Sequence, residues 1–261
     1  MIARVPLGAT GLEVSRLALG TGTTGFNCQS AQSRQPVSEY ATLLQHAHAL
    51  GVSFWDTSDD YGTYPHVRAA LQGLDRSEVV LTSKTWALSA RDARKSVEQA
   101  LDELGTDYLD VFLMHEVDSP EELGRRMEAL EELHRCKEAG LVRAVGLSTH
   151  AILTLEAVVG HPLIEVVMTN YNKANLHMDA NLKDYSKALE EARAAGQGTY
   201  VMKTLAEGKL AHDVEDAVAF NLSKPWIDSV TVGVRFLHEL EEMVAIASRH
   251  DPRGVDRMPL G

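Results

Sequence analysis

Residues 79–115 read VVLTSKTWALSARDARKSVEQALDELGTDYLDVFLMH, and this stretch contains the pattern that decides the fold. It begins with an apolar segment, Val79–Lys84, continues through an amphipathic segment near residues 91–104, and ends with a second apolar segment, Tyr108–His115. Gly105 follows the amphipathic segment, where a left-handed residue commonly ends a helix. The two apolar segments are nearly continuous rather than alternating, which is typical of parallel strands covered on both faces. The stretch therefore predicts a strand, a helix and a second parallel strand.

The same unit recurs along the whole chain. We expect strands at Arg16–Thr21, Ser53–Thr57, Val79–Lys84, Tyr108–His115, Val142–Ser148, Ile164–Thr169, Thr199–Lys203 and Ser229–Val232. We expect helices near residues 38–50, 65–73, 91–104, 121–139, 151–159, 180–195, 213–222 and 237–249. Gly51, Gly140 and Gly196 follow helical segments in the same way as Gly105. Eight such strand–helix units predict the α/β fold of a (β/α)8 TIM barrel.

The residues before the first barrel strand form a separate small unit. VPLGATGLEVS, at 5–15, places two short strand-like pieces around an Ala-Thr-Gly turn, which predicts a short β-hairpin that closes the barrel bottom. No linker, low-complexity tract or block of charge divides the chain, so residues 1–261 are expected to form one domain.

Composition narrows the classes of function. The chain has 25 Lys and Arg against 37 Asp and Glu, and its formal net charge of -12 argues against nucleic acid and acidic lipid surfaces as partners. Cys28 and Cys136 are too few for a disulfide framework or a four-cysteine cluster, and His46 and His48 point to different faces of a helix, so we expect no metal site. No signal segment is recognisable, and no apolar stretch approaches the roughly 18 residues of a membrane span. These features favour a cytoplasmic protein without a membrane partner.

Polar residues at the carboxyl ends of the barrel strands are the candidates for chemistry, because these ends form the functional face of a parallel barrel. Asp56 ends the second strand, Tyr61 lies in the loop that follows, Lys84 ends the third strand and His115 ends the fourth. A carboxylate can hold the Lys84 ammonium, whose charge should then lower the pKa of the Tyr61 phenol from about 10. His115 can donate a hydrogen bond to a substrate oxygen, and hydride transfer would need a cofactor.

Four segments in order resemble the aldo-keto reductase family, a family of (β/α)8 barrels. RVPLGATGLEVSRLALGTGT resembles its N-terminal hairpin and first strand, and GVSFWDTSDDYG resembles the segment that carries its Asp and Tyr. LTSK and LMH resemble the segments that carry its Lys and His. The resemblance implies a catalytic tetrad of Asp56, Tyr61, Lys84 and His115, in which Tyr61 protonates the carbonyl oxygen while a hydride arrives from the nicotinamide.

The resemblance also implies a cofactor and a class of reaction. VRAVGLSTH, VVMTNYN, TYVMKTLAEGKL and SVTVGVR resemble the family's fifth to eighth strand ends, which hold the nicotinamide amide, the pyrophosphate and the adenosine phosphate. The implied cofactor-binding residues are Gly22, Thr23, Asp56, Ser148, Lys203, Leu205, Gly233 and Arg235. The implied function is an oxidoreductase that transfers a hydride between NADP(H), with NAD(H) as the alternative, and a small aldehyde, ketone, sugar or alcohol.

Four positions depart from the family's pattern at the cofactor. Thr149 stands where many members have Asn, Met168 where they have Gln, Phe236 where Ser is common, and Met243 where Asn often meets the adenine. These departures bear on cofactor affinity and on the choice of NADP over NAD. Met168, Phe236 and Met243 add weight to a second class of function, a non-catalytic barrel that binds a nicotinamide nucleotide or a metabolite as a sensor or partner subunit.

The glycines after the first strand allow another interpretation. Gly20, Gly22 and Gly25 match the spacing of the dinucleotide fingerprint of a Rossmann fold, which requires a helix that opens at the glycines. The segment that follows, FNCQSAQSRQPVS, is instead a polar loop with a proline. We therefore interpret the glycines as a backbone floor beneath a nicotinamide, with a flexible loop as the alternative. The substrate, the preferred direction and the oligomeric state are not specified by the sequence.

Overall fold

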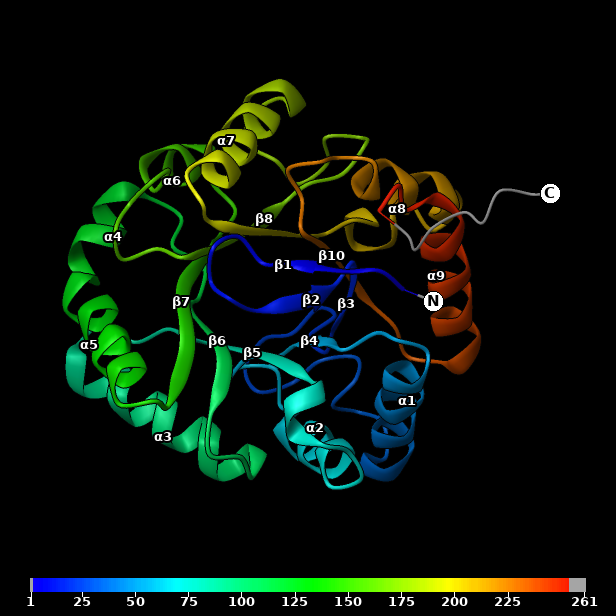
Figure 1. Ribbon diagram of the computed structural model, residues 1–261, viewed down its shortest axis with the longest axis horizontal. Coiled ribbons are helices and arrows are strands. Elements are labelled where there is room, and N and C mark those ends of the chain that lie inside the picture. Colours follow the sequence, from blue (N-terminus) through cyan, green and yellow to red (C-terminus); the bar gives the residue numbers. More distant parts are fainter. Residues whose placement is uncertain (1, 254–261) are drawn as a thin grey trace.

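The structure, a computed structural model, describes residues 2–253 and contains a closed barrel of eight parallel strands, in the order β10-β3-β4-β5-β6-β7-β8-β9 (Figure 1). The barrel strands are β3 (Leu17–Gly20), β4 (Phe54–Asp56), β5 (Val80–Thr85), β6 (Leu109–Met114), β7 (Val142–Thr149), β8 (Val166–Asn170), β9 (Gly198–Met202) and β10 (Ser229–Gly233). The helices are α1 (Val37–Ala49), α2 (Tyr64–Leu71), α3 (Ala90–Leu104), α4 (Pro120–Arg125), α5 (Met127–Glu138), α6 (Ile152–Ala157), α7 (Leu182–Ala194), α8 (Val214–Leu222) and α9 (Leu237–His250). The prediction of a (β/α)8 barrel is confirmed, and all eight predicted strands are present within one or two residues.

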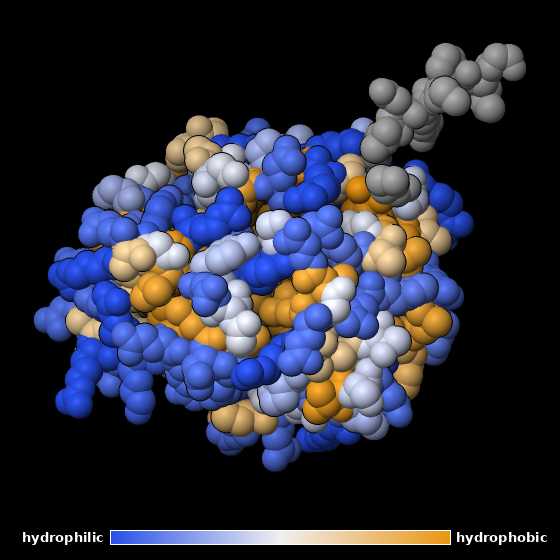
Figure 2. Space-filling view, turned by 60° about the horizontal axis from the view of Figure 1, so that its bottom comes forward, coloured by the Kyte–Doolittle hydropathy of each residue, from blue (hydrophilic) through white to orange (hydrophobic). Residues whose placement is uncertain are grey.

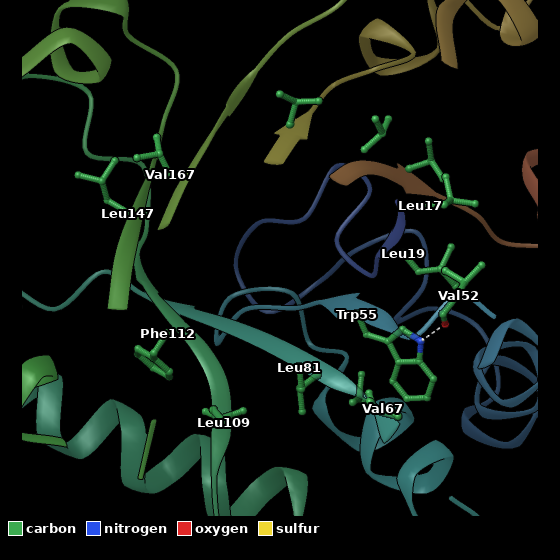
Figure 3. Close-up of a cluster of buried hydrophobic side chains, with 14 of the residues drawn as sticks. Leu17, Leu19, Val52, Trp55, Val67, Leu81, Leu109, Phe112, Leu147 and Val167 are labelled. Atoms are coloured by element: carbon green, nitrogen blue, oxygen red, sulfur yellow. Dashed lines mark hydrogen bonds between the residues drawn. The ribbon is translucent and has the colours of Figure 1, made fainter. Parts of the chain in front are cut away.

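Alternate side chains of the barrel strands β3 to β9 enter two different hydrophobic clusters. Trp55 and Phe112 belong to an outer cluster between the strands and the surrounding helices, shown in Figure 3, where the Trp55 indole N–H donates a hydrogen bond to the Val52 carbonyl at 3.1 Å. Their neighbours Phe54 and Val111 belong to an inner cluster that fills the barrel. This alternation follows from the two-residue period of a strand, and it explains why the strands read as continuous apolar runs.

The N-terminal hairpin closes the barrel bottom, as predicted. It consists of β1 (Arg4–Pro6) and β2 (Glu13–Ser15), and Figure 1 shows it across one end of the barrel. Leu7 and Leu12 of its turn belong to the inner cluster and are buried. The Ala9 amide donates a hydrogen bond to the Gly196 carbonyl at 2.7 Å. The hairpin therefore shields the apolar interior from water at this end.

The predicted glycines follow the ends of helices, but one predicted helix is divided in two. Gly105 follows α3 with φ of 67°, the left-handed conformation that favours glycine. The single helix expected over 121–139 is instead two helices, α4 and α5, that meet at Arg126. The Arg126 side chain is completely buried and donates hydrogen bonds to the carbonyls of Thr85 and His115. These tertiary contacts explain the break between α4 and α5, and the local pattern of apolar residues does not reveal them.

Polar side chains cover most of the visible surface in Figure 2, and hydrophobic residues form separate patches between them. Within residues 2–253, no helix combines the length and the apolar character that a membrane crossing requires.

Asp228 joins the hairpin to the barrel, and we expect its removal to destabilise the fold. One carboxylate oxygen accepts hydrogen bonds from the amides of Gly8 (3.0 Å) and Thr199 (3.1 Å), and the other accepts one from Arg193 (2.8 Å). Asp228→Ala should lower the free energy of unfolding by about 3 kcal/mol, because it leaves buried donors without partners. Urea denaturation measures this change. The exposed Asp107→Ala serves as control and should change stability by less than about 0.5 kcal/mol. Equal effects of the two substitutions on the free energy of unfolding would contradict this role of Asp228.

Candidate active site

Strand alternation directs the predicted catalytic side chains to one end of the barrel interior. Phe54 of β4 and Leu113 of β6 lie in the inner cluster. Asp56 and His115, two residues further along, therefore face the same way, at the carboxyl ends of these strands. Lys84 occupies the corresponding place near the end of β5. Three neighbouring strands thus bring a carboxylate, an ammonium and an imidazole to the functional face of the barrel.

A buried ion pair forms the centre of the site. The Lys84 ammonium donates hydrogen bonds to Asp56 Oδ1 at 2.5 Å and to the Thr57 carbonyl at 2.8 Å. The Tyr200 hydroxyl, from β9, donates a hydrogen bond to Asp56 Oδ2 at 2.8 Å. Lys84 and Asp56 are 1% and 2% exposed, so each charge depends on the other for compensation. The pair holds the ammonium in a single position.

The Tyr61 hydroxyl lies between this ion pair and the imidazole. It is 3.4 Å from Lys84 Nζ and 3.3 Å from His115 Nε2. The Lys84 ammonium also lies 4.9 Å from the centre of the Tyr61 ring. The structure therefore brings all four predicted residues together, with the phenol oxygen in contact with both the cation and the imidazole.

The glycines of the loop after β3 pack against the Tyr61 ring. A Cβ atom on Gly22 would lie 2.3 Å from this ring, and one on Gly25 would lie 2.6 Å from it. The contact accounts for glycine at both positions without a bound nicotinamide. The next helix, α1, begins only at Val37, so a Rossmann arrangement is absent from this loop.

The expected lowering of the Tyr61 pKa is wrong. Burial, reinforced by the negative charges of Asp56 and Glu116, raises the pKa of the Tyr61 phenol well above its ordinary value. Lys84 cannot overcome this because its own charge is already compensated by Asp56. Tyr61 is accordingly a neutral phenol at neutral pH, which is the form that can donate a proton.

His115 is held between two hydroxyl groups and an aromatic ring. Ser58 Oγ lies 3.0 Å from Nδ1, while the Tyr61 hydroxyl faces Nε2. The Trp86 ring lies 4.8 Å from the imidazole, centre to centre. Burial, and then the positive charge of Lys84, lowers the pKa of His115 well below its ordinary value, so the imidazole is neutral.

Ser58, Trp86 and Glu116 were not among the sequence candidates, although they belong to the same site. Ser58 lies inside the DTSDDY segment, Trp86 follows the Lys84 strand and Glu116 directly follows His115. Their position in loops directly after strand ends was the available signal.

Three of the predicted cofactor-binding residues lie at or just after the carboxyl ends of β7, β9 and β10, and they differ in their partners. Ser148 is buried, and its Oγ accepts a hydrogen bond from the Glu116 amide at 2.9 Å. Lys203 Nζ lies 3.1 Å from Glu207. The guanidinium of Arg235 is about half exposed and lies 3.9 Å from Glu239.

Three more of the predicted cofactor-binding residues, Thr23, Leu205 and Gly233, are mainly in contact with other protein groups. A Cβ on Gly233 would lie 2.1 Å from Thr23 Oγ1, so these two residues touch directly. Gln32 donates a hydrogen bond to the same hydroxyl at 2.7 Å. Leu205 is partly buried and packs against the outer hydrophobic cluster.

A polar group of the inner wall lacks a partner where a nicotinamide amide would be expected. Met168 is buried in the inner cluster and offers no hydrogen bond. Two residues further along β8, Asn170 donates a hydrogen bond to the His177 carbonyl at 2.7 Å, but its buried Oδ1 has no hydrogen-bond partner among residues 2–253. With the cationic side chains of Lys203 and Arg235 just after the carboxyl ends of β9 and β10, this chemistry fits a nicotinamide dinucleotide.

One cluster of possible metal ligands lies beside the site. Glu116, Asp118 and His150 each place one ligand atom within 4.8 Å of the others. Asp118 accepts hydrogen bonds from the His150 amide at 2.7 Å and from Thr149 Oγ1 at 3.3 Å, and its other oxygen lies 3.1 Å from His150 Nδ1. These bonds account for the arrangement without an ion, and the expectation of no metal site stays a prediction.

Comparison with known proteins establishes the family. The sequence pattern of the aldo/keto reductase family matches residues 17–253, and the chain therefore belongs to this family. An aldo-keto reductase of Schizosaccharomyces pombe whose name specifies NADP(+) is 28% identical over 190 residues, which cover 67% of this chain and 54% of that protein. An aldo-keto reductase of Mycolicibacterium paratuberculosis is 26% identical over 283 residues, which cover 98% of this chain and 94% of that protein.

The fold comparison agrees with the sequence comparison. A Pseudomonas aeruginosa protein assigned to the aldo-keto reductases superposes with a TM-score of 0.80 at 27% identity, covering 95% of each chain. This chain spans about half the length of the first curated relatives that it matches, 54% and 45%.

We expect His115 to remain neutral from about pH 8 down to below pH 6.5, because its pKa is lowered by burial and by Lys84. The unfolded chain takes up this proton at the ordinary pKa of about 6.5, so this residue reduces folded-state stability as the pH falls through that value. Nitrogen-15 NMR of the imidazole measures the protonation, with His115→Gln to assign the signal. A midpoint at or above about 6.5 would contradict the geometry.

Proposed function

We propose that the protein is an oxidoreductase that transfers a hydride between NADP(H), or NAD(H) as the alternative, and a small carbonyl or alcohol substrate. The observation that carries this proposal is the position of the Tyr61 hydroxyl, 3.4 Å from Lys84 Nζ and 3.3 Å from His115 Nε2. Family membership supports an oxidoreductase, and the NADP(+) named for the S. pombe relative supports the cofactor. The substrate, an aldehyde, ketone, sugar or corresponding alcohol, is proposed at the level of its class.

Tyr61 acts as the general acid when the carbonyl is reduced. Its phenol is neutral, and its proton passes to the carbonyl oxygen as negative charge develops there. The phenolate that remains lies beside the Lys84 ammonium, whose positive charge stabilises it. Asp56 keeps Lys84 charged and in position. In the reverse direction the same phenolate accepts the proton of the alcohol.

His115 orients the substrate rather than exchanging protons with it. The imidazole is neutral, and its Nε2 faces the place where the carbonyl oxygen would meet the Tyr61 hydroxyl. Trp86, which is 40% exposed beside the imidazole, offers an apolar wall for the rest of the substrate. A carbonyl group between these side chains is thereby oriented for reduction.

The nicotinamide supplies the hydride when it is bound. Lys203 and Arg235 would hold its phosphate groups, because both are cationic side chains just after the carboxyl ends of β9 and β10. Ser148 and the unpartnered oxygen of Asn170 would hold its amide, in place of the Gln that Met168 replaces.

A sensor or partner subunit without catalysis is the second candidate. One observation favours it: Glu239 accepts hydrogen bonds from the amides of Arg235 (2.7 Å) and Phe236 (3.3 Å), so these donors at the start of α9 are already engaged. Such engagement weakens the anion site that a helix N-terminus otherwise provides. This candidate requires nucleotide or metabolite binding without turnover.

Tyr61→Phe tests the proposed general acid. We expect kcat for reduction of a reactive aromatic aldehyde to fall by about 1,000-fold, because the proton donor is lost, with little change in NADPH affinity. Absorbance of reduced nicotinamide measures turnover, and fluorescence titration measures binding.

The matched control for this experiment is Tyr64→Phe, three residues further along the chain. The Tyr64 hydroxyl contacts Ser83 Oγ at 2.6 Å and is not part of the site. This variant should retain most of the turnover. Nucleotide binding by the wild-type protein without turnover of any aldehyde, ketone or sugar would support the sensor and contradict the enzyme.

A further inference from the structure

Glu116 occupies an unusual backbone position at the edge of the site. It directly follows His115 and has φ of 48°, a left-handed conformation that is unfavourable for a residue with a side chain. Hydrogen bonds from β7 maintain it: the Glu116 amide donates to Ser148 Oγ at 2.9 Å, and the Val117 amide donates to the Ser148 carbonyl at 2.8 Å. The strained position directs the side chain over the site rather than away from it.

The carboxylate of Glu116 lies beside the atoms that would face a substrate. Its Oε1 is 3.9 Å from His115 Nε2 and 3.9 Å from His150 Nε2. The side chain is 37% exposed and is therefore accessible to solvent. Its negative charge contributes to the raised pKa of Tyr61.

No Lys or Arg in the described part of the chain forms an ion pair with Glu116. Burial raises the pKa of its carboxyl, and the nearby charges of His150, Lys203 and Lys84 partly offset this effect. Between residues 2 and 253, no Lys or Arg nitrogen lies within 4.0 Å of the Glu116 carboxylate. Lys203 is paired with Glu207 instead, at 3.1 Å. His115 is neutral and does not compensate the charge.

We infer that Glu116 is a specificity-determining residue whose carboxylate makes the site favour uncharged and positively charged carbonyl compounds over those that carry a carboxylate or phosphate. A substrate carbonyl between Tyr61 and His115 lies within a few ångströms of Glu116, and a negative group on that substrate is repelled. At a separation of roughly 6 Å near a protein surface, repulsion between two unit charges corresponds to about 10- to 100-fold in affinity. The inference rests on the proposed function, because it identifies the substrate class of that same site.

Three aldehydes with one reactive group and different charge test this inference. They are 4-formylbenzoate, which is anionic, 4-formylbenzamide, which is neutral and of similar shape, and 4-formyl-N,N,N-trimethylanilinium, which is cationic. We would measure kcat/KM for each with the wild type and with Glu116→Gln at pH 8 and low salt. The intrinsic reactivity of each aldehyde cancels in the ratio of variant to wild type.

We expect Glu116→Gln to raise kcat/KM for the anionic aldehyde by at least about tenfold, because the repulsion is removed. The neutral aldehyde is the internal reference, and relative to it the value for the cationic aldehyde should fall. Added salt should reduce these differences in the wild type. A ratio that is the same for all three aldehydes would overturn the inference.

Two further variants control for a change in backbone conformation and for the loss of a negative charge elsewhere in the protein. Glu116→Asn removes the same charge with a residue that tolerates the left-handed conformation, and it should give the same order of substrates. Glu121→Gln, an exposed position of α4, removes one negative charge away from the site and should leave all three ratios unchanged.

Failure of the proposed function is distinguishable from failure of this inference. If the wild type reduces none of the three aldehydes, the proposed function fails. The charge assignment is then decided by calorimetric binding of 4-formylbenzoate and 4-formylbenzamide. Binding of the anion that improves at least about tenfold in Glu116→Gln supports the role of Glu116, and equal binding of both compounds by both proteins overturns it.

Discussion

The buried ion pair between Lys84 and Asp56 is the interaction on which the rest of the site depends. Both charges are almost completely excluded from water, and an unpaired charge there would be strongly destabilising. Neighbouring strands β4 and β5 supply the two partners, and Tyr200 reaches across from β9 to bind the second carboxylate oxygen. Pairing of β4 with β5 therefore assembles the ion pair, and closing the barrel adds the Tyr200 contact. The pair in turn places a cation beside the Tyr61 hydroxyl.

The pairing also explains the electrostatic character of the site. Asp56 compensates the positive charge of Lys84, so the ammonium does not deprotonate the Tyr61 phenol before a substrate binds. Burial keeps the phenol protonated. The cation is nevertheless in place to stabilise negative charge once the proton has left. Glu116 adds a negative charge at the edge, close to where a substrate oxygen would lie. In the proposed reaction, these charges would favour donation of a proton to a neutral carbonyl over binding of an anion.

The fold and the four central residues followed from the sequence because both depend on local pattern. Continuous apolar runs identify parallel strands, and polar residues at their ends identify the functional face. The break at Arg126 was not predicted, because it depends on hydrogen bonds to distant carbonyls. The contact of Gly22 and Gly25 with the Tyr61 ring is tertiary, so the sequence does not reveal it. The direction of the Tyr61 pKa shift depends on the balance of burial and several charges, which spacing along the chain does not reveal.

A double-mutant cycle tests the central claim most directly. The rate of a single hydride transfer would be compared in the wild type, Lys84→Met, Tyr61→Phe and the double variant. If the lysine acts through the phenol, removing it after Tyr61 is lost should cost little, and the combined loss should be close to that of Tyr61→Phe alone. Fully additive losses, with each substitution slowing the reaction by the same factor in either background, would contradict the account.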